Sequence, residues 1–180
     1  MGGGTLRGKR WQIILAGTGG QGLILAGEVL AKAAIFEGKK VIQTQSYGAQ
    51  TRGGYSQAEV IISDEEIYFP KCDQPNLILA LSQVAYDKYK GNVTNDCIIL
   101  YDQEIVTTNC RENDIGYSFN HRAIELGNTK ILNSIALGVV LRICSILKNT
   151  SVIKVLKEEL PERILELNLE AFNLGYESNN

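Results

Sequence analysis

The first fifty residues predict a strand, a helix and a second strand, in that order. Trp11 to Ala16 is a compact apolar run of the kind that forms a buried strand. After a cluster of glycines, a helix is predicted to run to about Glu37, where Gly38 is suited to the left-handed conformation that commonly ends a helix. Lys39 to Ser46 reads as the next strand. Such a segment of about 30 residues predicts a parallel βαβ unit.

The first helix is apolar almost all the way round. Only Gln21, Glu28 and Lys32 form a narrow polar stripe along it. A helix of this composition is normally covered on more than one side, so we expect it to be buried between the sheet and other helices.

The middle of the chain predicts further strands. Tyr55 to Ile62 alternates between apolar and polar residues, and Glu65 to Phe69 is expected to pair back on it as an antiparallel hairpin that Pro70 ends. The remaining predicted elements of this region are strands at Leu77–Leu81, Cys97–Tyr101 and Glu104–Thr108 and a short helix at Gln83–Lys90.

The last third of the chain is helical in pattern. Helices are predicted at Arg122–Leu126, Lys130–Leu147 and Val152–Leu160, with a final helix from Pro161 to about Gly175. The predicted fold class is therefore α/β: a single Rossmann-like domain with a mostly parallel sheet, an antiparallel hairpin and a helical C-terminal third. Residues 1–10 are predicted to be a flexible N-terminal tail and residues 11–180 the domain.

Composition excludes several kinds of chemistry. The 180 residues include one histidine, His121, and four cysteines that are far apart. Sites built on several imidazoles are excluded, and no Cys-x-x-Cys pair suggests a zinc knuckle, a redox pair or an iron–sulfur ligand run. We expect His121 to be structural, and Cys72 and Cys97 to be thiols without a nucleophilic role. No catalytic constellation and no metal site is predicted.

Charge and hydropathy add expectations about partners, membrane spans and location. Residues 1–58 carry a net charge of +5 and residues 59–180 a net charge of −7, so the glycine-rich front of the chain is suited to an anion or an acidic surface, although a solvated tail would explain half of this basicity. The most apolar stretch, Ile131 to Leu147, is interrupted by polar residues and is shorter than a bilayer requires. A cytoplasmic location with reduced thiols is expected.

The turn after the first strand satisfies Gly-x-Gly-x-x-Gly. Its residues are Gly17, Thr18, Gly19, Gly20, Gln21 and Gly22. Glycines in such a turn let an anion approach the N–H groups at the start of the helix. A dinucleotide site also needs an acidic residue for the ribose about 20 residues later, but after Glu37 the next acid is Glu59. Three interpretations remain: a tightly packed turn, a site for an anion or a cofactor phosphate of a complex, and a self-contained dinucleotide site.

A second loop, from Ser46 to Gly54, contains an isolated arginine followed by two glycines. Arg52 can form forked hydrogen bonds to a carboxylate or a phosphate, and an ion pair within the chain is the alternative. Both loops follow parallel strands, so they are expected at the same edge of the sheet. The predicted binding residues are Gly17, Gly19, Gly20, Gln21, Gly22, Arg52, Gly53 and Gly54.

Taken together, four segments give the chain a specific resemblance. The order GTGGQG, SYGAQTRGG, ISDEEIYFP and NLILALS resembles the gamma subunit of 2-oxoacid:ferredoxin (acceptor) oxidoreductases, and the similarity extends from Trp11 to Tyr176. Two positions depart from the pattern: Gln50 precedes the arginine where relatives often carry an acid, and Asn76 stands where Asp is common.

The resemblance implies a supporting subunit of an oxidative decarboxylase. The family converts a 2-oxoacid and coenzyme A to an acyl-CoA and carbon dioxide and passes the electrons to ferredoxin. It implies thiamine diphosphate, magnesium and iron–sulfur clusters on companion alpha, beta and delta subunits, with no cofactor assigned to this chain, which alone is expected to be inactive. The favoured substrate is 2-oxoglutarate, with pyruvate and branched-chain 2-oxoacids as alternatives. The rival interpretations are a free-standing nucleotide-binding reductase and a scaffold or interaction module with a relict α/β fold.

Overall fold

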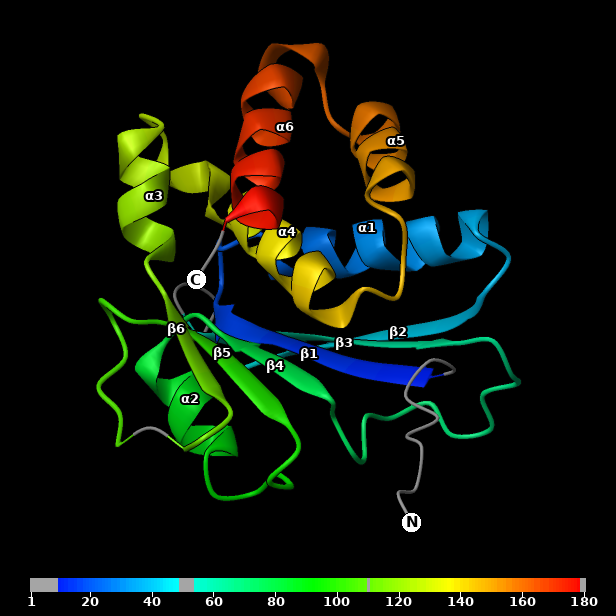
Figure 1. The fold of residues 1–180 in the computed structure, drawn as a ribbon, viewed down its shortest axis with the longest axis vertical. Helices are drawn as coiled ribbons and strands as arrows, with labels where there is room; N and C mark the ends of the chain where they lie inside the picture. Colours follow the sequence, from blue (N-terminus) through cyan, green and yellow to red (C-terminus); the bar gives the residue numbers. More distant parts are fainter. Residues whose placement is uncertain (1–9, 49–53, 110, 179–180) are drawn as a thin grey trace.

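A six-stranded sheet forms the centre of the molecule (Figure 1). The computed structural model describes residues 10–48, 54–109 and 111–178. The strands are β1 (Arg10–Thr18), β2 (Lys40–Tyr47), β3 (Tyr55–Ser63), β4 (Leu77–Ala80), β5 (Ile98–Asp102) and β6 (Asp114–Tyr117), in the spatial order β2-β3-β1-β4-β5-β6. Only β3 pairs antiparallel among these strands, with β1 on one side and β2 on the other. The mostly parallel sheet predicted from the sequence is therefore confirmed.

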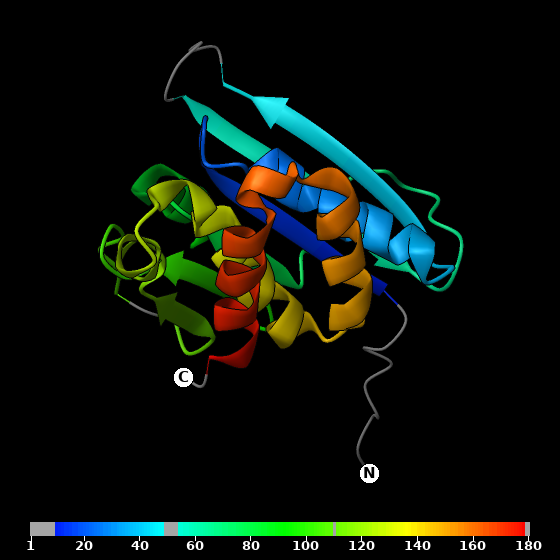
Figure 2. The same cartoon turned by 90° about the horizontal axis from the view of Figure 1, so that it is seen from above.

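Helices cover the two faces of the sheet unequally. The helices are α1 (Leu23–Phe36), α2 (Gln83–Tyr89), α3 (Phe119–Glu125), α4 (Leu132–Cys144), α5 (Asn149–Glu159) and α6 (Glu162–Glu177), with a 3₁₀ turn at Thr129–Ile131. Figures 1 and 2 show α1, α4, α5 and α6 gathered on one face, while α2 lies on the other. The predicted helical C-terminal third is confirmed and forms most of the thicker layer.

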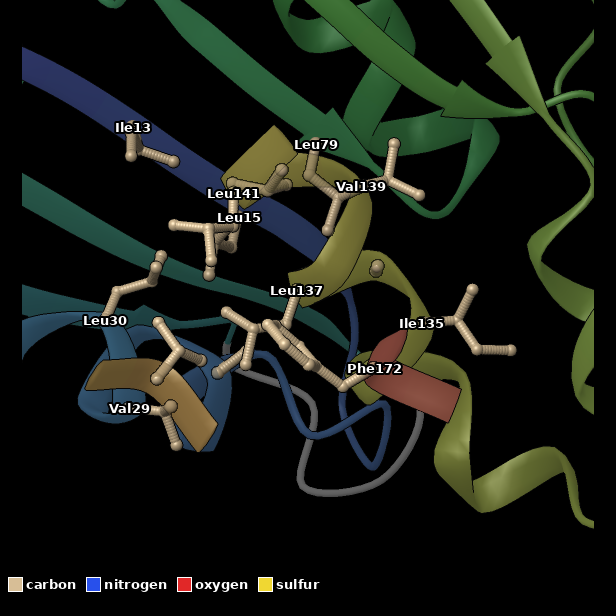
Figure 3. Packing of buried hydrophobic residues seen from close by; sticks show 14 of the residues in the cluster. Ile13, Leu15, Val29, Leu30, Leu79, Ile135, Leu137, Val139, Leu141 and Phe172 are labelled. Carbon is tan, nitrogen blue, oxygen red and sulfur yellow. The ribbon is translucent and has the colours of Figure 1, made fainter. Parts of the chain in front are cut away.

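The helical layer and the sheet enclose the larger of two apolar clusters. Figure 3 shows Leu15 and Leu79 of the sheet pointing toward Leu137 and Val139 of α4, with Phe172 of α6 beside them. All five side chains are buried. A smaller cluster on the opposite face packs around Tyr86 of α2.

The first helix is buried on several sides, as its composition predicts. It contacts β3 on the sheet and α5 above it. Ala33 and Ala34 are fully buried, and only at the end of the helix do Ile35 and Phe36 become exposed. Gly38 follows with a φ of 74°, which confirms the predicted end of the helix.

Two predicted strand assignments are wrong. The antiparallel partners of β3 are β1 and β2, and Glu65 to Phe69 forms no strand. Because β3 lies between two strands and is buried along most of its length, its two edges are already occupied. Glu104 to Thr108 is not a strand either, since Asp102 begins a turn there by accepting hydrogen bonds from the next backbone N–H groups, and β6 takes the edge position.

The inserted β3 also changes the first βαβ unit. Since two antiparallel pairings separate β1 from β2, these strands run in the same direction but are not neighbours. The domain limits stay a prediction, and residues 1–9 of the predicted tail lie outside the described residues. No helix in the described part of the chain has both the length and the apolar character needed to cross a membrane.

Candidate functional site

The glycine turn and the described end of the second loop, Gly54, meet at one edge of the sheet. The turn from Thr18 to Gly22 joins β1 to α1, and β3 begins beside it because Thr18 pairs with Tyr55. The backbone N–H of Gly19 donates a hydrogen bond of 2.8 Å to the carbonyl oxygen of Gly54. The structure thus brings Gly17, Gly19, Gly20, Gln21, Gly22 and Gly54 together, whereas Gln50, Arg52 and Gly53 lie outside the described residues.

The side chain of Gln21 folds back into its own turn. Its Oε1 accepts a hydrogen bond of 2.7 Å from the backbone N–H of Thr18, and its Nε2 donates one of 3.1 Å to the carbonyl oxygen of Leu81. A Cβ atom at Gly17 would lie 2.2 Å from this Oε1. The first glycine of the pattern therefore makes room for Gln21.

The last glycine of the pattern accommodates a residue of α4. Gly22 has a φ of 71°, and a Cβ atom there would lie 2.5 Å from Nδ2 of Asn133. Asn133 is 9% exposed, and its Oδ1 is buried without a hydrogen-bond partner among the described residues. The sequence could not reveal this contact, because Asn133 is 111 positions away from Gly22.

These contacts leave few backbone groups of the turn available to bind a ligand. The N–H groups of Thr18 and Gly19 are already used, one by Gln21 and the other by Gly54. Gly20 has a φ of 94° and no atom within 4 Å of where its Cβ would be, so the open side of the turn is at Gly20. Gly17 and Gly22 make room for side chains of this chain, and Gly19 donates a hydrogen bond to Gly54, which does not favour the self-contained dinucleotide site.

A polar network that the sequence did not predict lies next to Gly54, on the face of the sheet that carries α2. The ammonium group of Lys88 donates hydrogen bonds of 3.0 Å to the Tyr55 hydroxyl and to Oε1 of Gln57. Tyr89 also donates to this Oε1, and the Lys88 nitrogen lies 4.2 Å from the centre of the Tyr55 ring. Partial burial lowers the pKa of Lys88, while the charge of Glu59 opposes the shift.

Beyond Lys88, the network continues through the side-chain amide of Gln57, whose oxygen and nitrogen atoms both form hydrogen bonds. Gln57 is buried, and its Nε2 donates to Glu59, which in turn accepts a hydrogen bond from the backbone N–H of Cys72. A carboxylate and an ammonium group are thus joined through one buried side chain. This arrangement fixes α2 and the segment around Cys72 to β3, and leaves a positively charged group near the glycine turn.

In the described part of the chain, the other candidates from the sequence contribute no side-chain hydrogen bond to this network. His121 is exposed on α3, with its Nε2 3.3 Å from Glu125. Burial raises the pKa of the Cys97 thiol to about 11 and that of the Cys72 thiol to about 12, so both are poor nucleophiles near neutral pH. Across the described ranges, no three His, Cys, Asp or Glu side chains group as metal ligands would.

Comparison with known proteins decides the family. Residues 12–178 match the family model described as pyruvate ferredoxin/flavodoxin oxidoreductase. The chain belongs to this family. It is 41% identical to the 2-oxoglutarate synthase subunit KorC of Methanocaldococcus jannaschii, over 93% of each chain. Identity to the pyruvate synthase subunit PorC of Methanothermobacter marburgensis is 29%, over 92% of this chain and 96% of that one.

Solved structures of the family have the same fold. The gamma subunit of a keto/oxoacid ferredoxin oxidoreductase from Geobacter sulfurreducens is 36% identical, with a TM-score of 0.80 over 93% of this chain and 96% of that chain. A 2-oxoglutarate:ferredoxin oxidoreductase from Magnetococcus marinus, solved with 2-oxoglutarate, coenzyme A and succinyl-CoA bound, is 26% identical, with a TM-score of 0.85 over 93% of this chain and 30% of that chain. The expected gamma-subunit identity is confirmed, and the chain is a subunit of an oxidoreductase.

Proposed function

We propose that this gamma subunit works in a complex that oxidises 2-oxoglutarate. In the reaction, 2-oxoglutarate loses carbon dioxide, its acyl group forms a thioester with coenzyme A, and two electrons pass to ferredoxin. The observation that carries the proposal is the 41% identity to a 2-oxoglutarate synthase subunit over nearly the whole chain, compared with 29% to a pyruvate synthase subunit.

The substrate is tested on the intact complex. The chain would be tagged in its own cells, and the purified complex assayed with coenzyme A, an electron acceptor and one 2-oxoacid at a time. We expect kcat/KM for 2-oxoglutarate to exceed that for pyruvate and for 2-oxoisovalerate by about 100-fold or more. Pyruvate and 2-oxoisovalerate lack the second carboxylate, so the polar groups that bind it would have no partner. A preference for either of the other acids would contradict the proposal.

Companion subunits are proposed to hold the cofactors. Thiamine diphosphate, magnesium and iron–sulfur clusters would lie on alpha, beta and delta subunits, and ferredoxin would dock on the complex in the cytoplasm. In support, the chain contains no Gly-Asp-Gly motif and no run of closely spaced cysteines. The residues described above fit none of these groups, so we assign them no cofactor step.

For the glycine turn, we propose that it faces the companion subunits near the entrance of the active site. There Gly20, with Arg52 and Gly53 of the neighbouring loop, would contact a phosphate of a ligand held by the complex, such as coenzyme A. The open side of the turn at Gly20, the convergence with Gly54 and the nearby Lys88 cation support this placement.

Two glycines with similar backbones make this placement testable. Gly20 and Gly38 both have positive φ values and no atom within 4 Å of where a Cβ would be, but Gly38 follows the far end of α1. Ala at either position costs about 1–2 kcal/mol in backbone strain. We expect Gly20→Ala, and likewise Arg52→Ala, to lower kcat/KM of the complex for coenzyme A about tenfold, with Gly38→Ala close to wild type. Unchanged turnover in Gly20→Ala and Arg52→Ala would leave these loops with a structural role only.

A further inference from the structure

The strand β6 has a free edge at one side of the sheet. It pairs in parallel with β5 through four residues, and no other strand of the described structure follows it (Figures 1 and 2). A free edge offers backbone N–H and C=O groups to another extended chain.

The hydrogen bonds of β6 show which groups are available. The N–H of Gln103 donates to the carbonyl oxygen of Tyr117 at 3.2 Å, so the polar groups of Tyr117 face β5. Because successive residues of a strand direct these groups to opposite sides, those of Ile115 also face β5, and those of Gly116 face away from the sheet. Gly116 therefore presents a donor and an acceptor at the free edge.

The edge is open and held firmly. A surface depression of about 480 Å³ runs along it, lined by Gln103, residues 114–118 and Arg122. Asp114, whose side chain has no exposed surface, anchors the start of the strand by accepting hydrogen bonds from Tyr86 at 2.6 Å and from Arg111 at 3.0 Å. An incoming chain would thus meet a strand that is already ordered, which reduces the entropy lost on binding.

We propose that an extended segment of a companion subunit adds to β6 as a seventh strand of this sheet. Gly116 would exchange backbone hydrogen bonds with it, while Tyr101 and Gln103 of this chain, 3.0 and 3.2 Å from where a Cβ atom of Gly116 would be, already fill the space above Gly116. Arg122, half exposed at the rim, has only the exposed Glu125 as its partner in the ion pairs described. The segment is therefore expected to carry an acidic residue that pairs with Arg122.

A second copy of this chain fits the edge less well. If two copies paired through a two-fold axis, only the four residues of β6 from each copy would be in contact. The area buried by such a contact is far below the roughly 1,200 Å² that a stable interface buries. A companion subunit has no such limit, because it would contact this chain elsewhere as well. The inference rests on the chain acting within a complex, and it does not depend on which 2-oxoacid the complex consumes.

Hydrogen–deuterium exchange tests the proposal without any mutation. The amide of Gly116 would be followed in the isolated full-length chain and in the intact complex. We expect its exchange to slow at least about tenfold in the complex, as an added hydrogen bond requires. Equal exchange in both samples would overturn the proposal. So would slow exchange in the isolated chain that depends on its concentration, since this would assign the edge to a second copy.

Charge reversal gives an independent test that leaves the strand intact. Arg122→Glu is expected to weaken the binding of the chain to the rest of the complex about tenfold, while the same change at the exposed Arg163 of α6 is expected to leave binding unchanged. Equal affinities for the two variants would rule out the proposed acidic partner. Substrate preference would be unaffected by either result, so this test and the substrate assay can fail separately.

Discussion

At the scale of single residues, Gln21 determines the shape of the glycine turn. It closes a ring with Thr18 and connects the turn to Leu81 at the end of β4. Without Gln21, the Thr18 N–H group and the Leu81 carbonyl group would need water or a ligand as their hydrogen-bond partner. The Oε1 atom of Gln21 thus occupies the position in which a phosphate oxygen would accept a hydrogen bond from the Thr18 N–H group.

Replacing Gln21 tests this role directly. We expect Gln21→Ala to lower the free energy of unfolding by about 1–3 kcal/mol, because two partly buried backbone groups lose their partners. Chemical denaturation of the isolated chain measures the effect. Gln45→Ala is the matched control, since Gln45 is exposed on β2 and is expected to change stability by less than about 0.5 kcal/mol. Equal effects of the two changes would show that the Gln21 hydrogen bonds contribute nothing to stability.

At the scale of elements, two glycines set the distance between α4 and α6. A Cβ atom at Gly138 would lie 2.2 Å from the carbonyl oxygen of Phe172, and one at Gly175 would lie 2.1 Å from that of Ile135. The helices therefore contact each other through their backbones. This close approach buries Phe172 against the sheet layer and fixes the position of Asn133 beside the glycine turn.

We expect Gly138→Ala to be strongly destabilising. The new methyl group would have to push the helix backbones apart, and we expect a cost at the upper end of the roughly 1–3 kcal/mol typical of overpacking. Gly91→Ala provides the control, because a Cβ atom at Gly91 has open space around it. Thermal unfolding of both variants measures the difference, and a Gly138→Ala chain as stable as Gly91→Ala would disprove the backbone contact.

Helices were predicted more accurately than strand partners for a physical reason. The residues that make α1 apolar and the glycine that ends it are local, so its end near Glu37 could be read from the sequence. The partner of β3 depends on which of several apolar strands lies beside it, and alternation along Tyr55 to Ser63 does not carry that information. The same limit hid Lys88 and Asn133 from the predicted site, while the two glycine loops could be proposed from the sequence because each is a continuous motif.

At the scale of the molecule, the described residues form one folded α/β unit with helices on both faces of its sheet. Its apolar core is continuous from the sheet through α4 to α6. Its polar groups at the glycine turn are largely satisfied within the chain. The structure is therefore suited to support a site that other subunits complete.

The isolated chain is expected to fold but not to act. It should unfold cooperatively, oxidise no 2-oxoacid, and show no binding of NADH at 1 mM or below by calorimetry (a Kd above about 1 mM, or less than about 4 kcal/mol of binding free energy). The reason is that Thr18 and Gly19 have no N–H group left for a dinucleotide. Adding the chain to a complex that lacks it should restore turnover. Micromolar binding of NADH by the chain alone would instead support a free-standing reductase.

The antiparallel strand β3 also constrains the order in which the chain can fold. Tyr47 pairs with Ser56, nine positions away, whereas Arg10 pairs with Ser63, 53 positions away. Closing the short loop loses less chain entropy, so the β2–β3 ribbon is the natural early structure. β1 pairs with β3 on one side and with β4 on the other. During synthesis, β1 therefore cannot complete its pairing before Ala80 of β4 has left the ribosome.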